Sequence, residues 1–407
     1  MLFTPHITSI PQIFLVDGGK YARTPAGIAA ACADAQTAAA GGKSACVTII
    51  PGAPIAWDTT QIVITVSNVT VQAWPGTRVQ INLPASAAVV NPFIFSGTGL
   101  GAARSLSANG SMLDNNITLV AGSVGALGLA DDDLILITDN RPSYMTARIL
   151  SIAGETLQLS DDLGESFTTA RAAQVQKYIN PLVNCHMRGI NINANSNTGL
   201  GTVGVIWQYI TQCSMQECDS YGLGNSDTQA FMYALYGYLN TWQDMNARRS
   251  GTLNLPDMSF GFETRSYVHN LKSDMSPGFG PGFSGNQWCV VDAVNVGRAR
   301  YRAIKWSYCA WTAINNCLVT STTTHSGISL TLYTHDCMLN SNISTGGVGD
   351  GDLMINGDNN QINGGYYEKI SIAAPVVGAP APDNTRINAR YATLVDFGTN
   401  TKILAWP

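Results

Sequence analysis

Short runs in which apolar and polar residues alternate dominate the chain, and one Ala-rich segment near the N-terminus breaks that pattern. Alternation with a period of two is typical of a β-strand that turns one face to the interior. The runs CVTIIPG, IVITV and VTVQAW show it first, separated by turn residues. The Ala-rich run begins after Thr24-Pro25 and ends at Gly41-Gly42. Thr caps helices, Pro suits the first helical position and Gly ends helices, so this run predicts a helix.

An imperfect repeat extends from about residue 180 to about residue 370, and its signature is a polar residue followed by an apolar one. By subtraction of residue numbers, the apolar members lie 20 to 29 residues apart. The pairs are Asn184-Cys185, Gln212-Cys213, Thr241-Trp242, Asn270-Leu271, Ala293-Val294 (the exception to the polar rule), Asn316-Cys317, Asp336-Cys337 and Gln361-Ile362. One strand signal in each unit, with no 3.6-residue period between the signals, predicts a solenoid. A parallel β-helix fits best, because each coil then contributes short strands that stack ~4.8 Å from the next coil.

Residues 98–178 read as a small β domain inserted into this array. Short strands such as NITLVAG, DLILITD and ETLQLSD alternate there with polar turns. The acidic triplet at 131–133 lacks the D-x-[DN]-x-[DN]-G spacing of a calcium loop, so we expect a solvated turn.

Composition and charge exclude several classes of function. Only 12% of the 407 residues are charged and the net charge is −5, whereas a nucleic-acid-binding protein needs a basic surface. No run approaches the ~18 apolar residues of a membrane span. The N-terminus has no Lys or Arg before its apolar part, and Pro5 and Pro11 interrupt it, so we expect no signal peptide.

The nine cysteines show no CxxC pair and no Cys/His cluster at zinc spacing, so neither a metal nor a cofactor is predicted. A chain made without a signal peptide folds in a reducing compartment. We therefore expect buried free thiols, with a disulfide between Cys32 and Cys46 as the alternative. Their shared place in the repeat predicts that the following four face inward: Cys185, Cys213, Cys317 and Cys337.

The helix followed by CVTIIPGAPIAW and ITVSNVTVQAWPGTRVQI resembles the opening of right-handed parallel β-helix proteins of the pectate-lyase-like type. The insert followed by NPLVNCHMRGININ resembles bacteriophage tailspike and appendage proteins. The resemblance implies an all-β, right-handed parallel β-helix with an N-terminal capping helix and a small inserted β domain. It also implies a virion protein that associates in threes and binds surface glycans, which many such proteins cleave. No catalytic motif of these proteins is matched, so the resemblance assigns no catalytic residue.

These observations divide the chain into five parts. The expected parts are an N-terminal lead-in or virion anchor (1–20), the capping helix with the first coils (21–97), the inserted β domain (98–178), the main β-helix (179–370) and a C-terminal tail (371–407).

The longest repeat units lie between Cys213 and Val294 and contain the candidate catalytic acids Asp244, Glu263 and Asp274. Glycoside hydrolysis needs two carboxyl groups, about 5–5.5 Å apart for retention or about 6.5–9.5 Å apart for inversion. Stacked coils supply both spacings. The alternative is that these acids lie on solvated turns.

The same units contain candidate glycan-binding residues. Tyr236 and Trp242 belong to an aromatic-rich stretch, and sugar rings stack on exposed aromatic faces. Arg248 and Arg265 are candidates to meet the polar groups of a glycan. The alternative is that the aromatic residues fill the solenoid or an interface between subunits.

The sequence thus predicts a phage virion protein, a tailspike, fibre or appendage subunit, that engages a host surface polysaccharide. Its expected partners are this glycan, other virion proteins and two further copies of the chain, and it would be made in the host cytoplasm. One alternative is a glycoside hydrolase or lyase acting in the same groove. A second alternative is a purely architectural virion protein.

Overall fold

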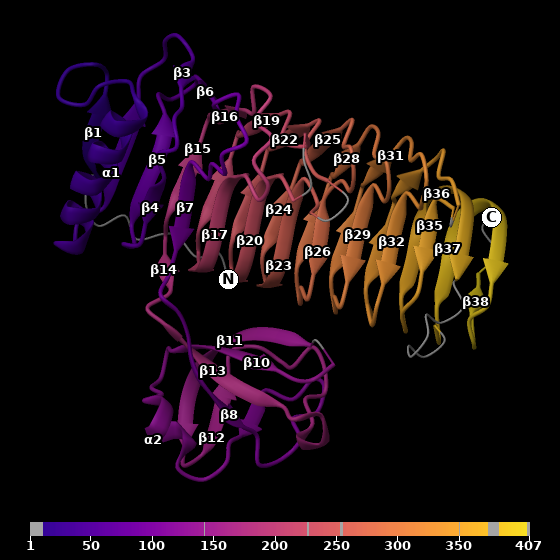
Figure 1. Ribbon diagram of the computed structural model, residues 1–407. Coiled ribbons are helices and arrows are strands. Elements are labelled where there is room, and N and C mark those ends of the chain that lie inside the picture. The colour runs from indigo at the N-terminus through magenta and orange to yellow at the C-terminus, as the bar shows by residue number, and fades with distance from the viewer. Residues whose placement is uncertain are drawn as a thin grey trace.

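The computed structural model describes residues 11–141, 143–225, 228–252, 255–349, 351–372 and 382–404. Most of its strands pair in parallel with the strand one coil away and form a long solenoid (Figure 1). The solenoid has three faces, and each coil passes through the first, the second and then the third face. The prediction of an all-β parallel β-helix is therefore confirmed.

The strands of each face follow one another along the solenoid. The first face contains β1 (Gln12–Val16), β2 (Ala45–Ile49), β5 (Val69–Ala73), β15 (His186–Arg188), β18 (Ser214–Gln216), β21 (Thr241–Gln243), β24 (Tyr267–His269), β27 (Val290–Asp292), β30 (Ala313–Asn315), β33 (Met338–Asn340) and β38 (Lys402–Ile403). The second face contains β3 (Ile55–Ala56), β6 (Val79–Asn82), β16 (Ile190–Asn193), β19 (Asp219–Tyr221), β22 (Asn246–Arg248), β25 (Lys272–Asp274), β28 (Asn295–Val296), β31 (Leu318–Val319) and β34 (Ile343–Ser344). The third face contains β4 (Ile62–Ile64), β7 (Phe93–Ser96), β17 (Val203–Thr211), β20 (Ala230–Tyr238), β23 (Met258–Thr264), β26 (Gly282–Ser284), β29 (Ile304–Ser307), β32 (Ile328–Thr331) and β35 (Leu353–Ile355). The short β14 (Leu182–Val183) pairs with the end of β17, and the long β36 (Gln361–Ile372) and β37 (Arg386–Asp396) run through all three faces.

Helix α1 (Pro25–Ala40) packs on β1, β2, β4 and β5 at the N-terminal end of the solenoid (Figure 1). It begins as predicted: the Thr24 side chain accepts a hydrogen bond from the Gly27 N–H, and Pro25 takes the first helical position. Ile28, Ala31 and Ala35 are buried against the first coils. The helix therefore covers the apolar interior that the first coil would otherwise expose. Among the described residues no helix is long and apolar enough to cross a membrane.

Corners with left-handed backbone explain the polar residue of the repeat. Asn184 (φ 55°) and Gln212 (φ 55°) precede the first face, and Asn270 (φ 50°) and Asn316 (φ 53°) precede the second. Asn adopts a positive φ more readily than most residues, and the next side chain then points inward. The alignment of repeat units predicted from sequence was wrong. It treated as equivalent residues that lie at corners before the first face, at corners before the second face and, for Trp242, in the middle of a first-face strand.

All nine cysteines are buried and free, as expected. Cys185, Cys213 and Cys337 follow corners that precede the first face, and Cys317 follows a corner that precedes the second. Their inward direction is confirmed, although Cys317 belongs to a different column of side chains.

The insert between β7 and β14 forms a separate antiparallel sheet with its own apolar core. Its strands, in spatial order, are β8 (Gly99–Ser105), β13 (Gln174–Ile179), β10 (Leu134–Thr138), β11 (Tyr144–Ala153), β12 (Thr156–Leu159) and β9 (Asn116–Thr118). A bridge between Leu106 and Leu119 joins the two edges, so the sheet closes on itself. The short helices α2 (Ser123–Leu127) and η1 (Thr169–Arg171) lie in its loops.

The insert docks on the outside of the solenoid through polar contacts. Asp161 of the insert pairs with Arg265 and accepts a hydrogen bond from the Tyr238 hydroxyl at 2.7 Å. The indole N–H groups of Trp288 and Trp311 donate to insert carbonyls at 3.0 and 2.9 Å. These contacts come from several coils, so the insert is fixed to the solenoid rather than merely tethered to it.

Two expected boundaries need correction. The lead-in expected at 1–20 already contains β1, which pairs with β2 as the first rung, while residues 1–10 lie outside the described residues. The tail expected at 371–407 contains β37, which pairs with β36, and β38, which pairs with β37. The solenoid therefore continues past residue 370.

A buried ionic cluster joins the insert to the solenoid and makes the docking sensitive to pH. Glu165 of the insert lies 3.6 Å from His335 Nε2, and His335 Nδ1 lies 2.7 Å from Asp336. Burial alone would lower the pKa of His335, but hydrogen bonds and charges from Asp336 and Glu165 outweigh it and raise the pKa to about 9. Because the pKa is raised on folding, the contribution of His335 to stability is complete below its unfolded pKa of about 6.5. It is lost as the pH rises through 9.

We predict that the docked insert loosens between pH 7 and pH 9.5, and that His335→Gln removes this change. Amide hydrogen exchange of the segment around Glu165, compared at these two pH values after correction for intrinsic rates, measures the loosening. An equal increase in exchange in wild type and in the variant would contradict the assignment to His335.

Candidate functional site

The outside of the second face carries a regular array of polar side chains. Three neighbouring coils enter this face through left-handed corners at Glu217, Asp244 and Asn270, and alternate residues then point outward. Three neighbouring coils contribute the outward triplets Glu217-Asp219-Tyr221, Asp244-Asn246-Arg248 and Asn270-Lys272-Asp274. The intervening residues are buried inside, as Cys218, Met245 and Leu271 show. The parallel register aligns the triplets into rows along the solenoid.

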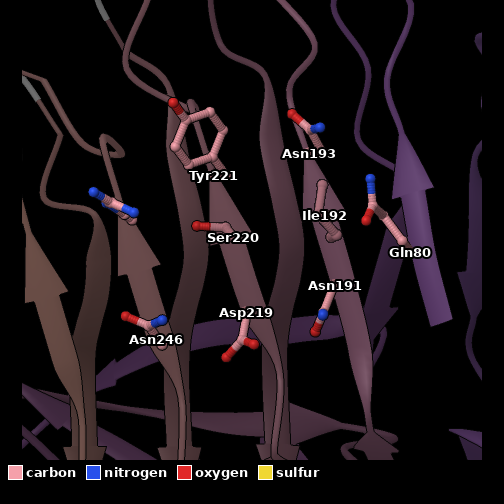
Figure 2. Close-up of a pocket in the computed structure, with 9 residues that line it drawn as sticks. Gln80, Asn191, Ile192, Asn193, Asp219, Ser220, Tyr221 and Asn246 are labelled. Atoms are coloured by element: carbon pink, nitrogen blue, oxygen red, sulfur yellow. The ribbon is translucent and has the colours of Figure 1, made fainter. Parts of the chain in front are cut away.

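Two adjoining hollows lie on these rows, and we call them together the polar groove. The first, of about 320 Å³, is lined by Gln80, Asn191, Ile192, Asn193, Asp219, Ser220, Tyr221, Asn246 and Arg248 (Figure 2). The second, of about 430 Å³, is lined by Arg78, Glu217, Asp219, Asp244, Met245, Asn246, Asn270 and Lys272. Asp219 and Asn246 line both hollows, so the groove is continuous across several coils. Figure 2 shows Tyr221 and Asn193 at one end of the first hollow, with Asp219 and Asn191 further along their strands.

Arginines neutralise most carboxylates of the groove and its margins. Arg78 pairs with Asp219, and Arg188 makes two hydrogen bonds to Glu217 at 2.7 and 3.0 Å. The hydrogen bonds from Arg188 lower the pKa of Glu217, with the charges of Arg188 and Arg78 acting in the same direction. These bidentate and short contacts hold the side chains in fixed positions, which a binding surface needs.

Asp244 differs from these carboxylates in its surroundings. Its Oδ1 accepts a hydrogen bond from Asn270 Nδ2 at 2.6 Å, and its Oδ2 accepts one from Gln243 Nε2 at 2.8 Å. No cation pairs with it among the described residues. Two neutral amides therefore orient Asp244 without neutralising its charge, and it lines the same hollow as Asp219 and Glu217. Of the three predicted catalytic acids, Asp244 is the one whose position allows chemistry on a bound ligand.

Asp274 lies at the edge of the same face and is engaged by two arginines. Arg248 Nε lies 3.8 Å from it and Arg298 Nε lies 3.4 Å from it. Of the predicted glycan-binding residues, Arg248 lines the groove, where it also holds Asp274. The structure thus brings Asp244, Arg248 and Asp274 onto one face.

The predictions for Glu263 and Trp242 were wrong, because both side chains point into the solenoid. Trp242 is fully buried, and Glu263 is 1% exposed. Glu263 accepts hydrogen bonds from Asn240 Nδ2 at 3.0 Å and from the Ser266 hydroxyl. Burial raises the pKa of Glu263 to about 7, against these hydrogen bonds, so the group is a structural acid without access to solvent.

Tyr236 and Arg265 are also misplaced as glycan-binding residues. The Tyr236 ring lies between Tyr209 and Phe262, with ring centroids 5.1 and 4.9 Å away, so both of its faces are covered. Arg265 pairs with the buried Asp161 of the insert. Both residues serve the contact between the third face and the insert, and neither is free to stack on or bind a sugar.

Sequence reasoning missed Tyr221 as a groove residue, together with the amides of Asn191 and Asn193. A signal was present: the run Glu217-Cys-Asp-Ser-Tyr221 has the same outward positions as the run that starts at Asp244. Finding it required the position of the corner, which the mixed register concealed.

No protein-family model and no curated protein matches the chain. The tailspike of Acinetobacter baumannii bacteriophage AP22, solved in complex with A. baumannii capsular saccharide, aligns with a TM-score of 0.53 and 12% identity. The alignment covers 92% of this chain, which spans 66% of the AP22 chain. DFA-IIIase of Arthrobacter chlorophenolicus A6 aligns with a TM-score of 0.50 and 11% identity, over 95% of this chain and 86% of the enzyme. The chain therefore has the fold of a tailspike-like parallel β-helix protein.

Proposed function

We propose that the protein is a phage virion subunit, of the tailspike, fibre or appendage type, that binds a host surface polysaccharide in the polar groove. The observation that carries the proposal is the exposed ring of Tyr221 among fixed amide and ion-paired side chains. Tyr221 is 43% exposed, and the guanidinium carbon of Arg249 lies 5.8 Å from the centroid of the Tyr221 ring. The fold that the chain shares with the AP22 tailspike supports the proposal.

The chemistry of the groove suits a carbohydrate. Amide side chains such as Asn191, Asn193 and Asn246 both donate and accept hydrogen bonds, as sugar hydroxyls require. An aromatic ring supplies the apolar surface on which the C–H face of a sugar stacks. Because the rows repeat along the solenoid, the groove is elongated and open at its ends, which fits a chain molecule better than a small metabolite.

We predict that Tyr221→Ala weakens the binding of the protein to its host cells at least tenfold, because it removes the stacking surface and leaves the fold intact. Tyr267→Ala is the matched control, since Tyr267 is 39% exposed on the first face, outside the groove. Flow cytometry with labelled protein measures retention on the cells. Equal retention of both variants would contradict the groove assignment.

The enzyme alternative rests on Asp244, whose charge is oriented but not neutralised beside Asp219 and Glu217. If the protein cleaves its glycan, Asp244→Asn lowers the rate by about 10²–10⁴-fold, because general acid–base groups contribute that much. Binding should survive, since the Asn oxygen still accepts one of the two amide hydrogen bonds. Release of reducing ends from host polysaccharide measures cleavage. A wild-type rate that Asp244→Asn leaves unchanged would remove Asp244 from the mechanism, whereas binding without cleavage by the wild type supports the binding function.

We further propose that three copies associate on the virion and contact other virion proteins there, outside the host cytoplasm in which the chain is made. Leu318, Ile343 and Tyr366 form an apolar row on the outside of the last coils, each between 38% and 43% exposed. A row of this kind suits a second copy of the chain. In the alternative of a purely architectural virion protein, the three copies still associate, but the protein binds no glycan.

Static light scattering at micromolar concentration should give three times the 43.2 kDa chain mass. Ile343→Glu should give a monomer, because it places three like charges at the contact. A monomer mass for the wild type would contradict a trimer of the isolated chain.

A further inference from the structure

Loops of successive coils stack aromatic rings on the outside of the corner that follows the second face. The rings of Phe279 and Tyr301 lie 5.7 Å apart, and the Tyr301 ring stacks on His325 at 5.6 Å. Main-chain hydrogen bonds fix the loops on one another, because the Tyr301 N–H donates to the Gly278 carbonyl at 3.0 Å. Phe279, Tyr301 and His325 are partly exposed, so the stack holds part of its aromatic surface in a fixed position beside solvent.

Two cations flank the first two rings. Lys305 Nζ lies 5.4 Å from the centroid of Phe279, and the guanidinium carbon of Arg300 lies 5.6 Å from the centroid of Tyr301. Neither cation forms an ion pair with a carboxylate among the described residues. The arginines of the groove and its margins, Arg78, Arg188, Arg248 and Arg298, all pair with acids. Lys272, which lines the second hollow, resembles Lys305 in having no described carboxylate as an ion-pair partner.

Lys305 is half-buried, and no carboxylate in the described part of the chain pairs with it. Burial, and then the charge of Arg302, lower the pKa of Lys305. A charge removed from water costs free energy unless an opposite charge compensates it. A bound anion would supply that compensation.

We propose that Phe279, Arg300, Tyr301 and Lys305 form a subsite for an acidic sugar residue of the polysaccharide. The sugar packs against the exposed part of the aromatic pair, and its carboxylate pairs with Lys305 or Arg300. The inference names the substrate class of the proposed glycan binding and rests on that function. The subsite is continuous with the second face, because Arg298, two residues before Arg300, pairs with Asp274.

Saturation-transfer NMR on the full chain tests the subsite with three probes: glucuronate, glucose 6-sulfate and glucose. We expect glucuronate to bind at least tenfold more tightly than glucose, since a hydrogen-bonded charge is worth that much. Lys305→Gln should abolish the preference. Lys43→Gln is the matched control, because Lys43 is an exposed lysine beyond the end of α1. Circular dichroism checks that Lys305→Gln is folded, and Arg300→Gln, at an exposed position, provides a second variant.

The outcomes separate this inference from the proposed function. Equal binding of glucuronate and glucose, or a preference unchanged in both the Lys305 and Arg300 variants, overturns the subsite. Displacement of glucuronate by an equal concentration of inorganic sulfate also overturns it, because the site would then bind any anion. Preference for glucose 6-sulfate over glucuronate supports an anionic sugar but assigns a sulfate in place of the carboxylate. If the protein is retained on host cells through Tyr221 but shows no preference for glucuronate over glucose, the proposed glycan binding stands and the acidic subsite does not. If the protein prefers glucuronate but is not retained on host cells, the proposed function is refuted and the anion subsite stands.

Discussion

The parallel stacking of coils is the constraint on which the rest of the structure depends. Because each strand pairs in register with the strand one coil away, a side chain has the equivalent residue of the next coil as its neighbour ~4.8 Å along the axis. Side chains at equivalent positions of neighbouring coils must therefore be able to pack against one another. Rings stack on rings inside, as Phe260, Phe283 and Trp306 do with centroids 5.0 and 4.9 Å apart. Charges outside must alternate or pair, which explains why Arg188 holds Glu217 of the next coil.

The columns of stacked rings on the inside and outside of the third face each have a gap. An aromatic ring from another part of the chain fills each gap. In the third face, Ala234 interrupts the inward column between Trp207 and Phe260, and Trp242 of the first face contacts both neighbours. On the outside of the same face, Gly285 interrupts the row after Phe262. Tyr144 of the insert occupies this gap, 4.1 Å from Phe262, and a Cβ at Gly285 would come within 2.6 Å of the Phe262 ring. The small residue in each column thus determines where a distant aromatic residue packs.

The same two gaps explain why the fold could be predicted from the sequence while several site residues could not. The polar–apolar repeat was sufficient for the fold, because left-handed corners favour residues such as Asn184 and Asn316 wherever they occur. It was insufficient for the site, since the two kinds of corner look alike in one sequence. Trp242 was predicted to be exposed because a strand pattern does not reveal that Ala234, on another face, leaves room for it. Tyr236 was misplaced for a related reason. Nothing near it in sequence indicates that an insert from well upstream in the chain would cover that face.

Charge distribution separates the parts of the surface by role. Only 12% of the residues are charged, and many of them hold something in position. Asp161 and Glu165 hold the insert, and the arginines of the groove hold its acids, so these charges are already compensated within the chain. Asp244, Arg300 and Lys305 form no ion pair among the described residues, and all three lie on or beside the second face. A polymer that carries hydroxyl groups throughout and negative charge at intervals would complement this arrangement. In the proposed binding, its neutral units would meet amides in the groove, away from the acids that arginines already occupy, and its charged units would meet Arg300 and Lys305 at the corner.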